Sequence, residues 1–353
     1  MLINILNFDR PELTSELTSR LGVEKFRSKQ IIQWIYRQGI NNFDEMTDIS
    51  KSVRDKLKDH YTVNFPTLET RLDSIDGSRK YLWRLTDGTL IESVLIKQPK
   101  RYTLCISSQV GCAIGCKFCR TGLMGLKRNL ETSEIIGQVL AVKEDIRKRG
   151  TLTEDFYNIV FMGMGEPLHN YDNVTRAVRL LNDNIGLDFT PRKITVSTSG
   201  LVPAIKKFGE SAVEANLAIS LNATTDEVRE RIMPLNKKWP LKDLISTLKE
   251  FPLKNKKRLT LEYVLLKGVN DSDEDLKRLP NLIKDLQAKV NLIPYNENTG
   301  LGFYPPSREV IDKWQKTLLS KKVNSTIRWS KGQDISAACG QLATDSKRKD
   351  KAH

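Results

Sequence analysis

The alternation of apolar and polar positions divides the chain into regions of different period. In the first region the apolar positions recur with a helical period, as in "KFRSKQIIQWIYRQGI", where Ile31, Ile32, Trp34 and Ile35 share one face. Basic residues occupy the opposite face, and "NFDEMTDISKSVRDKLKDH" predicts a second helical unit. We therefore expect residues 1–65 to form a helical accessory domain.

The period changes to two in residues 66–100. The segments "LETRLDSI", "SRKYLWRL" and "TLIESVLI" alternate, and two Asp-Gly pairs separate them, which predicts a β-meander that links the flanking regions. Glu92 lies on the more uniformly apolar face of the third strand. Burial there would disfavour the charged carboxylate and raise its pKa toward the range of acid–base catalysis. The alternative is an edge-strand glutamate that reaches solvent.

Strands and helices alternate through residues 101–323, which predicts an α/β fold. The predicted strands are "YTLCISS" (102–108), "FYNIVFMG" (156–163), "RKITVSTS" (192–199), "ANLAISLN" (215–222), "LTLEYVLL" (259–266) and "AKVNLIPYN" (288–296). The predicted helices lie near 131–149, 172–183, 201–209, 225–233, 241–250 and 272–287. Six β-then-α units with right-handed crossovers form a parallel sheet that curves into a partial (β/α)6 barrel. Functional side chains then collect at the carboxyl ends of the strands.

The last region, residues 324–353, holds a further strand, "NSTIRWS", and a tail that carries Cys339. The tail sequence "DISAACGQLATD" is rich in small residues, and we expect it to be flexible. The closing "DSKRKDKAH" predicts disorder.

Charge suggests a partner. The chain has 57 Lys and Arg against 43 Asp and Glu, a formal net charge of +14. Such an excess favours a polyanion, foremost RNA, although a generally basic proteome or solubility tuning explains it as well. The accessory domain is accordingly either an RNA-contacting domain or a plain helical bundle with solvated lysines. No apolar run of 18 residues and no basic leader occur, so we expect a cytosolic protein that does not span a membrane.

Five cysteines in a reducing compartment predict ligands, nucleophiles or buried thiols. Cys112, Cys116 and Cys119 follow the first barrel strand with C-x3-C-x2-C spacing, so three thiolates can converge on one soft-metal centre. Structural zinc usually takes four protein ligands. A [4Fe–4S] cluster held by three thiolates leaves one iron open for another ligand. We predict the cluster, with zinc as the alternative.

This motif at the end of a first barrel strand resembles the radical S-adenosylmethionine (SAM) superfamily. There the open iron binds SAM, and electron transfer splits a C–S bond and releases a 5′-deoxyadenosyl radical. The resemblance implies polar SAM contacts at the later strand ends, where glycines let a ligand approach closely and Glu166 accepts a hydrogen bond from an ammonium group. The implied SAM residues are Gly165, Glu166, Ser197, Ser220, Leu221, Asn222 and Asn296.

The set "GCAIGCKFC", "RNLETSEIIGQVL", "MGMGEP" and "AACGQL", with Cys105, resembles the RlmN/Cfr family of RNA adenine methyltransferases over nearly the whole chain. The resemblance implies that Cys339 carries the methyl group as S-methylcysteine, with two SAM used per turnover. It also implies that Glu92 accepts a proton and that Cys105 resolves the intermediate through a transient disulfide with Cys339. Without the tail cysteine, the default interpretation of Cys105 is a buried strand thiol.

The motif set is more similar to RlmN than to Cfr. This implies methylation of adenine C2 in 23S rRNA at the peptidyl-transferase centre and in the tRNA anticodon loop, a reduced flavodoxin-type electron donor, and a monomer. Asn222 stands where the family pattern has histidine. The alternatives are Cfr-like methylation of C8, another radical SAM enzyme with no need of Cys105 or Cys339, and a non-catalytic, zinc-stabilised RNA-binding module.

Overall fold

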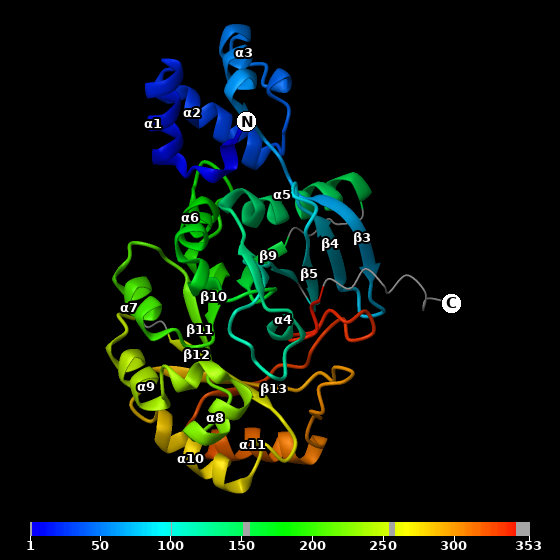
Figure 1. The fold of residues 1–353 in the computed structure, drawn as a ribbon, viewed down its shortest axis with the longest axis vertical. Helices are drawn as coiled ribbons and strands as arrows, with labels where there is room; N and C mark the ends of the chain where they lie inside the picture. Colours follow the sequence, from blue (N-terminus) through cyan, green and yellow to red (C-terminus); the bar gives the residue numbers. More distant parts are fainter. Residues whose placement is uncertain (1, 100, 151–155, 254–257, 344–353) are drawn as a thin grey trace.

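The computed structural model describes residues 2–99, 101–150, 156–253 and 258–343. A helical domain at the N-terminus stands at one end of the molecule, next to a curved sheet flanked by helices (Figure 1). Among the described residues, no helix is long and apolar enough to cross a membrane. The segment "DSKRKDKAH", for which disorder is predicted, lies outside them.

The N-terminal domain is helical, as predicted. Its helices are α1 (Arg10–Leu21), α2 (Lys25–Ile32) and α3 (Lys51–His60). Ile31, Ile32 and Ile35 are at most 1% exposed, so the predicted apolar face forms the core of this domain. The short strand β1 (Ile3–Asn4) pairs in parallel with β2 (Tyr61–Thr62), which brings the two ends of the domain together.

The predicted meander and barrel form one continuous sheet. Its strands are β3 (Thr67–Asp73), β4 (Arg79–Arg84), β5 (Leu90–Gln98), β6 (Arg101–Cys105), β9 (Phe156–Phe161), β10 (Ile194–Thr198), β11 (Asn216–Ser220), β12 (Leu259–Leu265), β13 (Ala288–Pro294) and β14 (Ser325–Ile327). The spatial order is β14-β13-β12-β11-β10-β9-β6-β5-β4-β3. The strands of this sheet from β6 through β9 to β14 are parallel, and β3 to β5 join them as antiparallel neighbours through the β5–β6 pair. The meander is therefore part of the barrel wall and not a separate linker.

Helices connect the parallel strands. They are α5 (Thr132–Arg149), α6 (Tyr171–Asn182), α7 (Val202–Glu210), α8 (Asp226–Ile232), α9 (Leu241–Glu250), α10 (Asp273–Ile283) and α11 (Arg308–Ser320). The partial (β/α)6 barrel is confirmed, and the two helices predicted between its fourth and fifth strands are α8 and α9. One correction is that α11, which was not predicted, follows the sixth strand. Ile311, Trp314 and Leu318, which are all buried, give α11 a helical period that could have predicted it.

Strand register shows which side chains face the barrel interior. Ser220 of β11 is paired with Glu262 of β12, and Cys105 is paired with residues of β5 and β9. Paired residues point to the same side of a sheet, as do residues two positions apart. Tyr263, on the opposite side, contacts Trp314 of α11 with ring centroids 5.2 Å apart, so that side faces the helices. The side chains on the interior side include Glu92, Cys105, Ser197, Ser220 and Glu262.

Candidate active site

The three clustered cysteines lie in the loop of a small hairpin. Strand β7 (Gln109–Gly111) pairs with β8 (Leu126–Asn129), and the loop between them, residues 112–125, contains the short helix α4 (Arg120–Leu123). Gly111 has φ +79°, and a Cβ atom there would lie 1.8 Å from the carbonyl oxygen of Gly125. Only glycine allows this approach, so the sequence itself closes the two ends of the cysteine loop against each other.

The three thiols share one poorly solvated environment. Burial raises the pKa of Cys112 to about 12 and that of Cys116 well above its usual value, and negative charge on the neighbouring thiols adds to both shifts. Burial likewise raises the pKa of Cys119. The three thiols thus influence one another electrostatically. A positively charged metal centre bound to their sulfur atoms would favour the thiolate form of all three despite their burial.

This arrangement fits a cluster better than a single ion. Among the described residues, no three His, Cys, Asp or Glu side chains are gathered closely enough to hold one metal ion. In a [4Fe–4S] cluster the three thiolates bind three different irons, so their sulfur atoms do not need to meet at one point. Cys116 and Cys119 also pack against the apolar side chains of Phe118, Met233 and Tyr295, which shield the loop from water.

The "GMGEP" segment after β9 packs against the cysteine hairpin. Gly165 has φ +102°, and a Cβ atom there would lie 2.5 Å from the Cβ of Gln109. Glu166, which is 3% exposed, accepts hydrogen bonds from the amide and hydroxyl of Ser199, both at 2.7 Å, and from the amide of Leu168 at 3.1 Å. Burial raises the pKa of Glu166.

These contacts revise the expected chemistry of the segment. Gly165 lies close to Gln109 of β7, so its missing side chain makes room for another part of the protein. The carboxylate of Glu166 already accepts hydrogen bonds from Ser199. The segment therefore fixes the ends of β7, β9 and β10 relative to one another. Its part in binding SAM stays a prediction.

The serines predicted to contact SAM lie on the interior side of the sheet. The hydroxyl of Ser197 donates to the carbonyl oxygen of Phe161 at 2.7 Å and keeps its acceptor lone pairs. Ser220 is half-buried at the end of β11, in register with Glu262. Leu221, which follows Ser220, is fully buried.

Asn222 is a support of the strand ends and not an open polar contact. It is 1% exposed and has φ +57°. Its Oδ1 accepts a hydrogen bond from the amide of Val264 at 2.8 Å, and its Nδ2 donates to the sulfur of Met233 at 3.3 Å. Asparagine tolerates this left-handed backbone, which gives a local reason for the residue at this position.

A buried arginine that sequence reasoning missed ties two strand ends together. Arg229 of α8 is 0% exposed. Its guanidinium donates to the carbonyl oxygens of Ser199, Ser220 and Leu221 at 2.6, 3.2 and 3.0 Å. In the sequence Arg229 stands between two glutamates of a charged helix, a pattern typical of a solvated face, so nothing there signalled its burial.

The Cys339 segment, defined here as residues 330–343, is ordered and packed, which corrects the expectation of a flexible tail. Figure 1 shows it (red) beside α4. Its alanines Ala337 and Ala338 are 6% and 3% exposed. The carbonyl oxygen of Gly340 accepts from the amide of Arg120 at 2.9 Å, and that of Leu342 accepts from the hydroxyl of Thr121 at 2.7 Å.

Asn296 holds this same segment. Its Nδ2 donates to the carbonyl oxygen of Cys339 at 3.2 Å, and its Oδ1 accepts from Gln333 at 3.0 Å. Asn298 adds a bond to the carbonyl oxygen of Gly340 at 3.3 Å. The side chain predicted to contact SAM therefore positions the cysteine segment in this structure.

Of the two remaining cysteines, Cys105 faces the barrel interior from β6, and both Cys105 and Cys339 are free thiols. Cys105 is buried, whereas Cys339 is exposed. Desolvation by the surrounding protein, followed by the charge of Glu262, raises the pKa of Cys339 to about 11. Burial raises the pKa of Cys105, and the charge of Cys339 adds to that rise, which places the two sulfur atoms within electrostatic range.

Glu92 has a charged partner that sequence reasoning missed. Glu92 and Lys80 are 4% and 7% exposed, and Lys80 Nζ lies 3.1 Å from Glu92 Oε1. The apolar face predicted around Glu92 thus includes a buried ammonium group, which favours the ionised carboxylate. Lys80 is in register with Val94, two residues from Glu92, so the hairpin register could have revealed the pair.

Comparison with known proteins assigns the family. Residues 3–63 match the ribosomal RNA large subunit methyltransferase N-terminal domain, and residues 106–279 match the radical SAM superfamily. The chain is 51% identical over 96% of its length to the dual-specificity RNA methyltransferase RlmN of Geotalea uraniireducens, covering 96% of that protein. It is 50% identical over 97% of its length to the RlmN of Geobacter sulfurreducens, covering 92% of it. The chain belongs to the RlmN family.

A solved structure agrees with this assignment. The crystal structure of a radical SAM methyltransferase from Sphaerobacter thermophilus superposes with a TM-score of 0.90 at 41% identity, over 96% of this chain and 99% of that one. The family uses a [4Fe–4S] cluster and SAM, so the zinc-stabilised binding module is excluded and the Cfr-like alternative is not favoured. The resemblance inferred from the motifs, the radical SAM fold and the methyltransferase class are confirmed.

Proposed function

We propose that this RlmN family member methylates C2 of an adenine in 23S rRNA, at the peptidyl-transferase centre, and in the anticodon loop of tRNA. The observation that carries the proposal is a second pair of thiols near the cysteine loop: the charge of Cys339 adds to the raised pKa of Cys105, and the segment that carries Cys339 is hydrogen-bonded to Arg120 of the loop. A radical SAM enzyme that needed only its cluster would have no use for this second pair of thiols. The relatives named dual-specificity RNA methyltransferases support the two classes of RNA.

In this proposal Cys112, Cys116 and Cys119 hold the cluster. Cluster and SAM together supply the radical, and SAM also supplies the methyl group. Ser197 and Ser220 offer hydroxyl groups to SAM from the interior ends of β10 and β11. The other predicted SAM residues contribute by fixing the backbone at the strand ends against which SAM would lie. These residues are Gly165, Glu166, Leu221, Asn222 and Asn296.

Three side chains perform the remaining chemistry. Cys339 takes the methyl group after losing its proton, because the thiolate is the nucleophile. Loss of a hydrogen atom from the S-methyl group leaves a methylene radical, which adds to C2 of the adenine and joins Cys339 to the RNA. Glu92, whose Oε1 lies 3.1 Å from Lys80 Nζ, then takes the proton from this substituted ring carbon. Cys105 forms a disulfide with Cys339 and so frees the methylated base. Each turnover leaves these two thiols oxidised, and two electrons from an external donor, proposed to be reduced flavodoxin, restore them.

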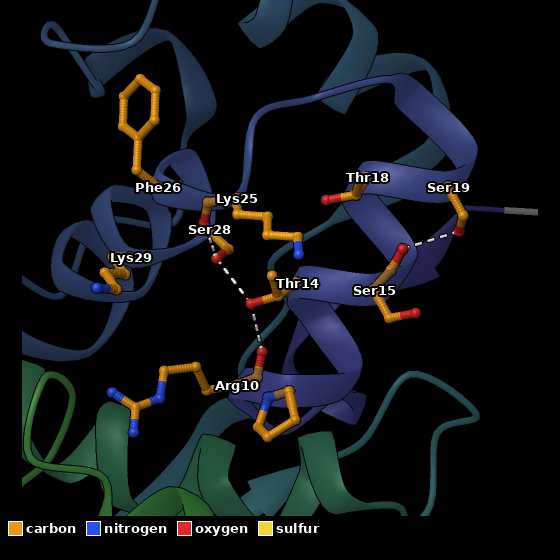
Figure 2. A pocket seen from close by; sticks show the side chains of 10 residues that line it. Arg10, Thr14, Ser15, Thr18, Ser19, Lys25, Phe26, Ser28 and Lys29 are labelled. Atoms are coloured by element: carbon orange, nitrogen blue, oxygen red, sulfur yellow. Dashed lines mark hydrogen bonds between the residues drawn. The ribbon is translucent and has the colours of Figure 1, made fainter.

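The N-terminal domain supports RNA contact through a groove between α1 and α2. The groove has a volume of about 960 Å³. Figure 2 shows the amine of Lys25 extending across it toward α1. Its ten lining residues include three cations and five hydroxyl side chains and no carboxylate: Arg10, Pro11, Thr14, Ser15, Thr18, Ser19, Lys25, Phe26, Ser28 and Lys29. Phe26 is 49% exposed and offers a face on which a base can stack.

Salt dependence tests this groove. Replacing Lys25 and Lys29 together with alanine should lower the slope of log affinity against log salt by about 1–2, since each phosphate contact contributes about 0.7–0.9. The matched control replaces Lys242 on α9 and Lys284, which directly follows α10, and should leave the slope unchanged. An unaltered slope in the groove variant contradicts RNA binding at this site.

Methylation itself is tested with purified, anaerobically reconstituted protein, a 23S rRNA fragment and a tRNA. We expect 2-methyladenosine in both RNAs by mass spectrometry, and none from Cys339→Ala. Formation of 8-methyladenosine, or full turnover by Cys339→Ala, would contradict the proposal. The site needs no second copy of the chain, and the chemistry needs RNA and reduced thiols, so we propose a cytoplasmic monomer.

A further inference from the structure

A buried ion pair contacts both ends of the stretch that carries Cys339. Lys80 Nζ donates to the carbonyl oxygen of Ser336 at 3.3 Å, and it lies 3.1 Å from Glu92 Oε1. The other carboxylate oxygen of Glu92 accepts a hydrogen bond from the amide of Ala343 at 2.9 Å. Cys339 lies between these two contacts in the chain. The pair therefore joins the meander wall of the barrel to the segment on either side of the carrier thiol.

Burial makes this connection sensitive to charge. The side chains of Lys80 and Glu92 are 9% and 5% exposed, so both charges are shielded from water. Removing one charge from a buried pair leaves the other uncompensated, which costs far more than losing a pair at the surface. The hydrogen bond from the amide of Ala343 is also stronger to an ionised carboxylate than to a neutral one.

We propose that Lys80 is a positioning residue that couples the charge of Glu92 to the position of Cys339. With Glu92 ionised, the pair holds Ser336 and Ala343, and the segment is closed. When a proton moves from the substituted ring carbon to a Glu92 oxygen, the electron pair of the broken C–H bond stays on the adduct and the carboxyl group becomes neutral. Both contacts weaken, and the segment is released.

This coupling rests on the proposed function, and it gives the reaction an order. Proton transfer to Glu92 comes just before Cys339 must move toward Cys105. The side chains of Asn296, Asn298 and Thr121 stay neutral throughout the reaction. Their hydrogen bonds therefore hold the segment equally before and after the proton transfer. The Lys80–Glu92 pair is the contact that the chemistry itself switches.

Hydrogen exchange of the resting holoenzyme tests the clamp without turnover. Glu92→Gln imitates the neutral acid, and Lys80→Met removes the ammonium but keeps the chain length. Each should speed amide exchange in residues 336–343 by about tenfold or more, with little change in the rest of the barrel. Lys80→Arg should keep exchange slow.

The matched control removes a second shielded ion pair from the same wall. Arg71 on β3 lies 3.2 Å from Asp145, and their side chains are 15% and 10% exposed. Arg71→Met should leave exchange in residues 336–343 at the wild-type rate. Wild-type exchange in Glu92→Gln or Lys80→Met overturns the proposal, and so does an increase spread evenly over the whole barrel.

A second readout separates positioning from general damage. With RNA, SAM and a reductant, Lys80→Met should still form S-methyl-Cys339 but should accumulate the covalent enzyme–RNA adduct, because loss of the neighbouring ammonium disfavours the ionised carboxylate that accepts the proton. Equal loss of S-methylation and adduct would contradict a positioning role. If wild-type protein makes no methylated RNA while both variants still open the segment, the proposed function fails and the clamp stands.

Discussion

The cysteine loop and the Cys339 segment meet at the same site but are held in different ways. The loop is closed by backbone packing, with Gly111 against Gly125, and both its ends belong to the β7–β8 hairpin. The segment is held mainly by single hydrogen bonds from side chains of distant elements, such as Asn296 and Thr121. Steric closure cannot yield without a clash, whereas hydrogen bonds can be exchanged one by one for water. One half of the site is fixed, and the other can be released.

The largest expected effect comes from a substitution that prevents the closure of the cysteine loop. Gly111→Ala combines a strained backbone, worth about 1–3 kcal/mol, with an overlap against a carbonyl oxygen. It should remove most of the iron bound after anaerobic reconstitution, measured as iron per chain. Gly88→Ala is the control, because Gly88 has φ +80° but no atom within 4 Å of the added Cβ. Full iron binding by Gly111→Ala would show that the closure of the loop is not steric.

The second largest expected effect concerns the reactivity of the Cys339 thiol. The surroundings of Cys339 raise its pKa from 9.0 to about 11, so the thiolate fraction near pH 8 falls about a hundredfold. Alkylation of Cys339 in the folded holoenzyme, followed by peptide mass spectrometry, should still rise about tenfold per pH unit between pH 9 and 10. In the denatured chain the rate should level off above pH 9. A plateau near pH 9 in the folded protein would contradict the raised pKa of Cys339.

The smallest effect comes from loosening one outer contact of the segment. Asp334 accepts hydrogen bonds from the hydroxyl of Ser74 at 2.6 Å and the amide of Ile75 at 3.1 Å. Asp334→Ala should speed hydrogen exchange in the segment severalfold and leave bound iron unchanged. A loss of iron in this variant would mean that the two halves are not independent.

The same contact has a defined pH dependence. The hydrogen bond from Ser74 holds the pKa of Asp334 below its usual value. A carboxyl group whose folded pKa is lowered stabilises the fold above its unfolded pKa of about 4, and this contribution is lost as pH falls through the lower folded value. Exchange in the wild-type segment should therefore approach that of Asp334→Ala only below about pH 4. Equal exchange rates in the wild-type protein and in Asp334→Ala near neutral pH would contradict a stabilising role of the hydrogen bonds to Asp334.

Much of the barrel could be predicted because its strands are buried on both sides and appear as continuous apolar runs. The cysteine hairpin could not, since β7 and β8 are only three and four residues long and too short for a period to show. The cysteine spacing predicted a cluster site without any knowledge of that hairpin. Sequence reasoning thus predicted a chemistry for the loop but not the reason for its shape.

The Cys339 segment shows the opposite failure. Its small residues were interpreted as a sign of mobility, yet Ala337 and Ala338 are small because they pack closely against other parts of the chain. The contacts from Lys80 and Glu92 join residues 256 and 251 positions apart in the sequence. A local pattern carries no information about such pairs, so the Lys80–Glu92 clamp became visible only in the folded chain.

The pairing of β5 with β6 bears on how the family can diversify. Glu92 and Cys105 belong to neighbouring strands of one hydrogen-bonded ladder, so backbone geometry, and not loop length, sets their spacing. Insertions in the connecting turns, or exchange of the whole N-terminal module, would leave that spacing intact. Evolution or protein engineering could accordingly retarget the enzyme to new nucleic acids while its reaction chemistry stays unchanged.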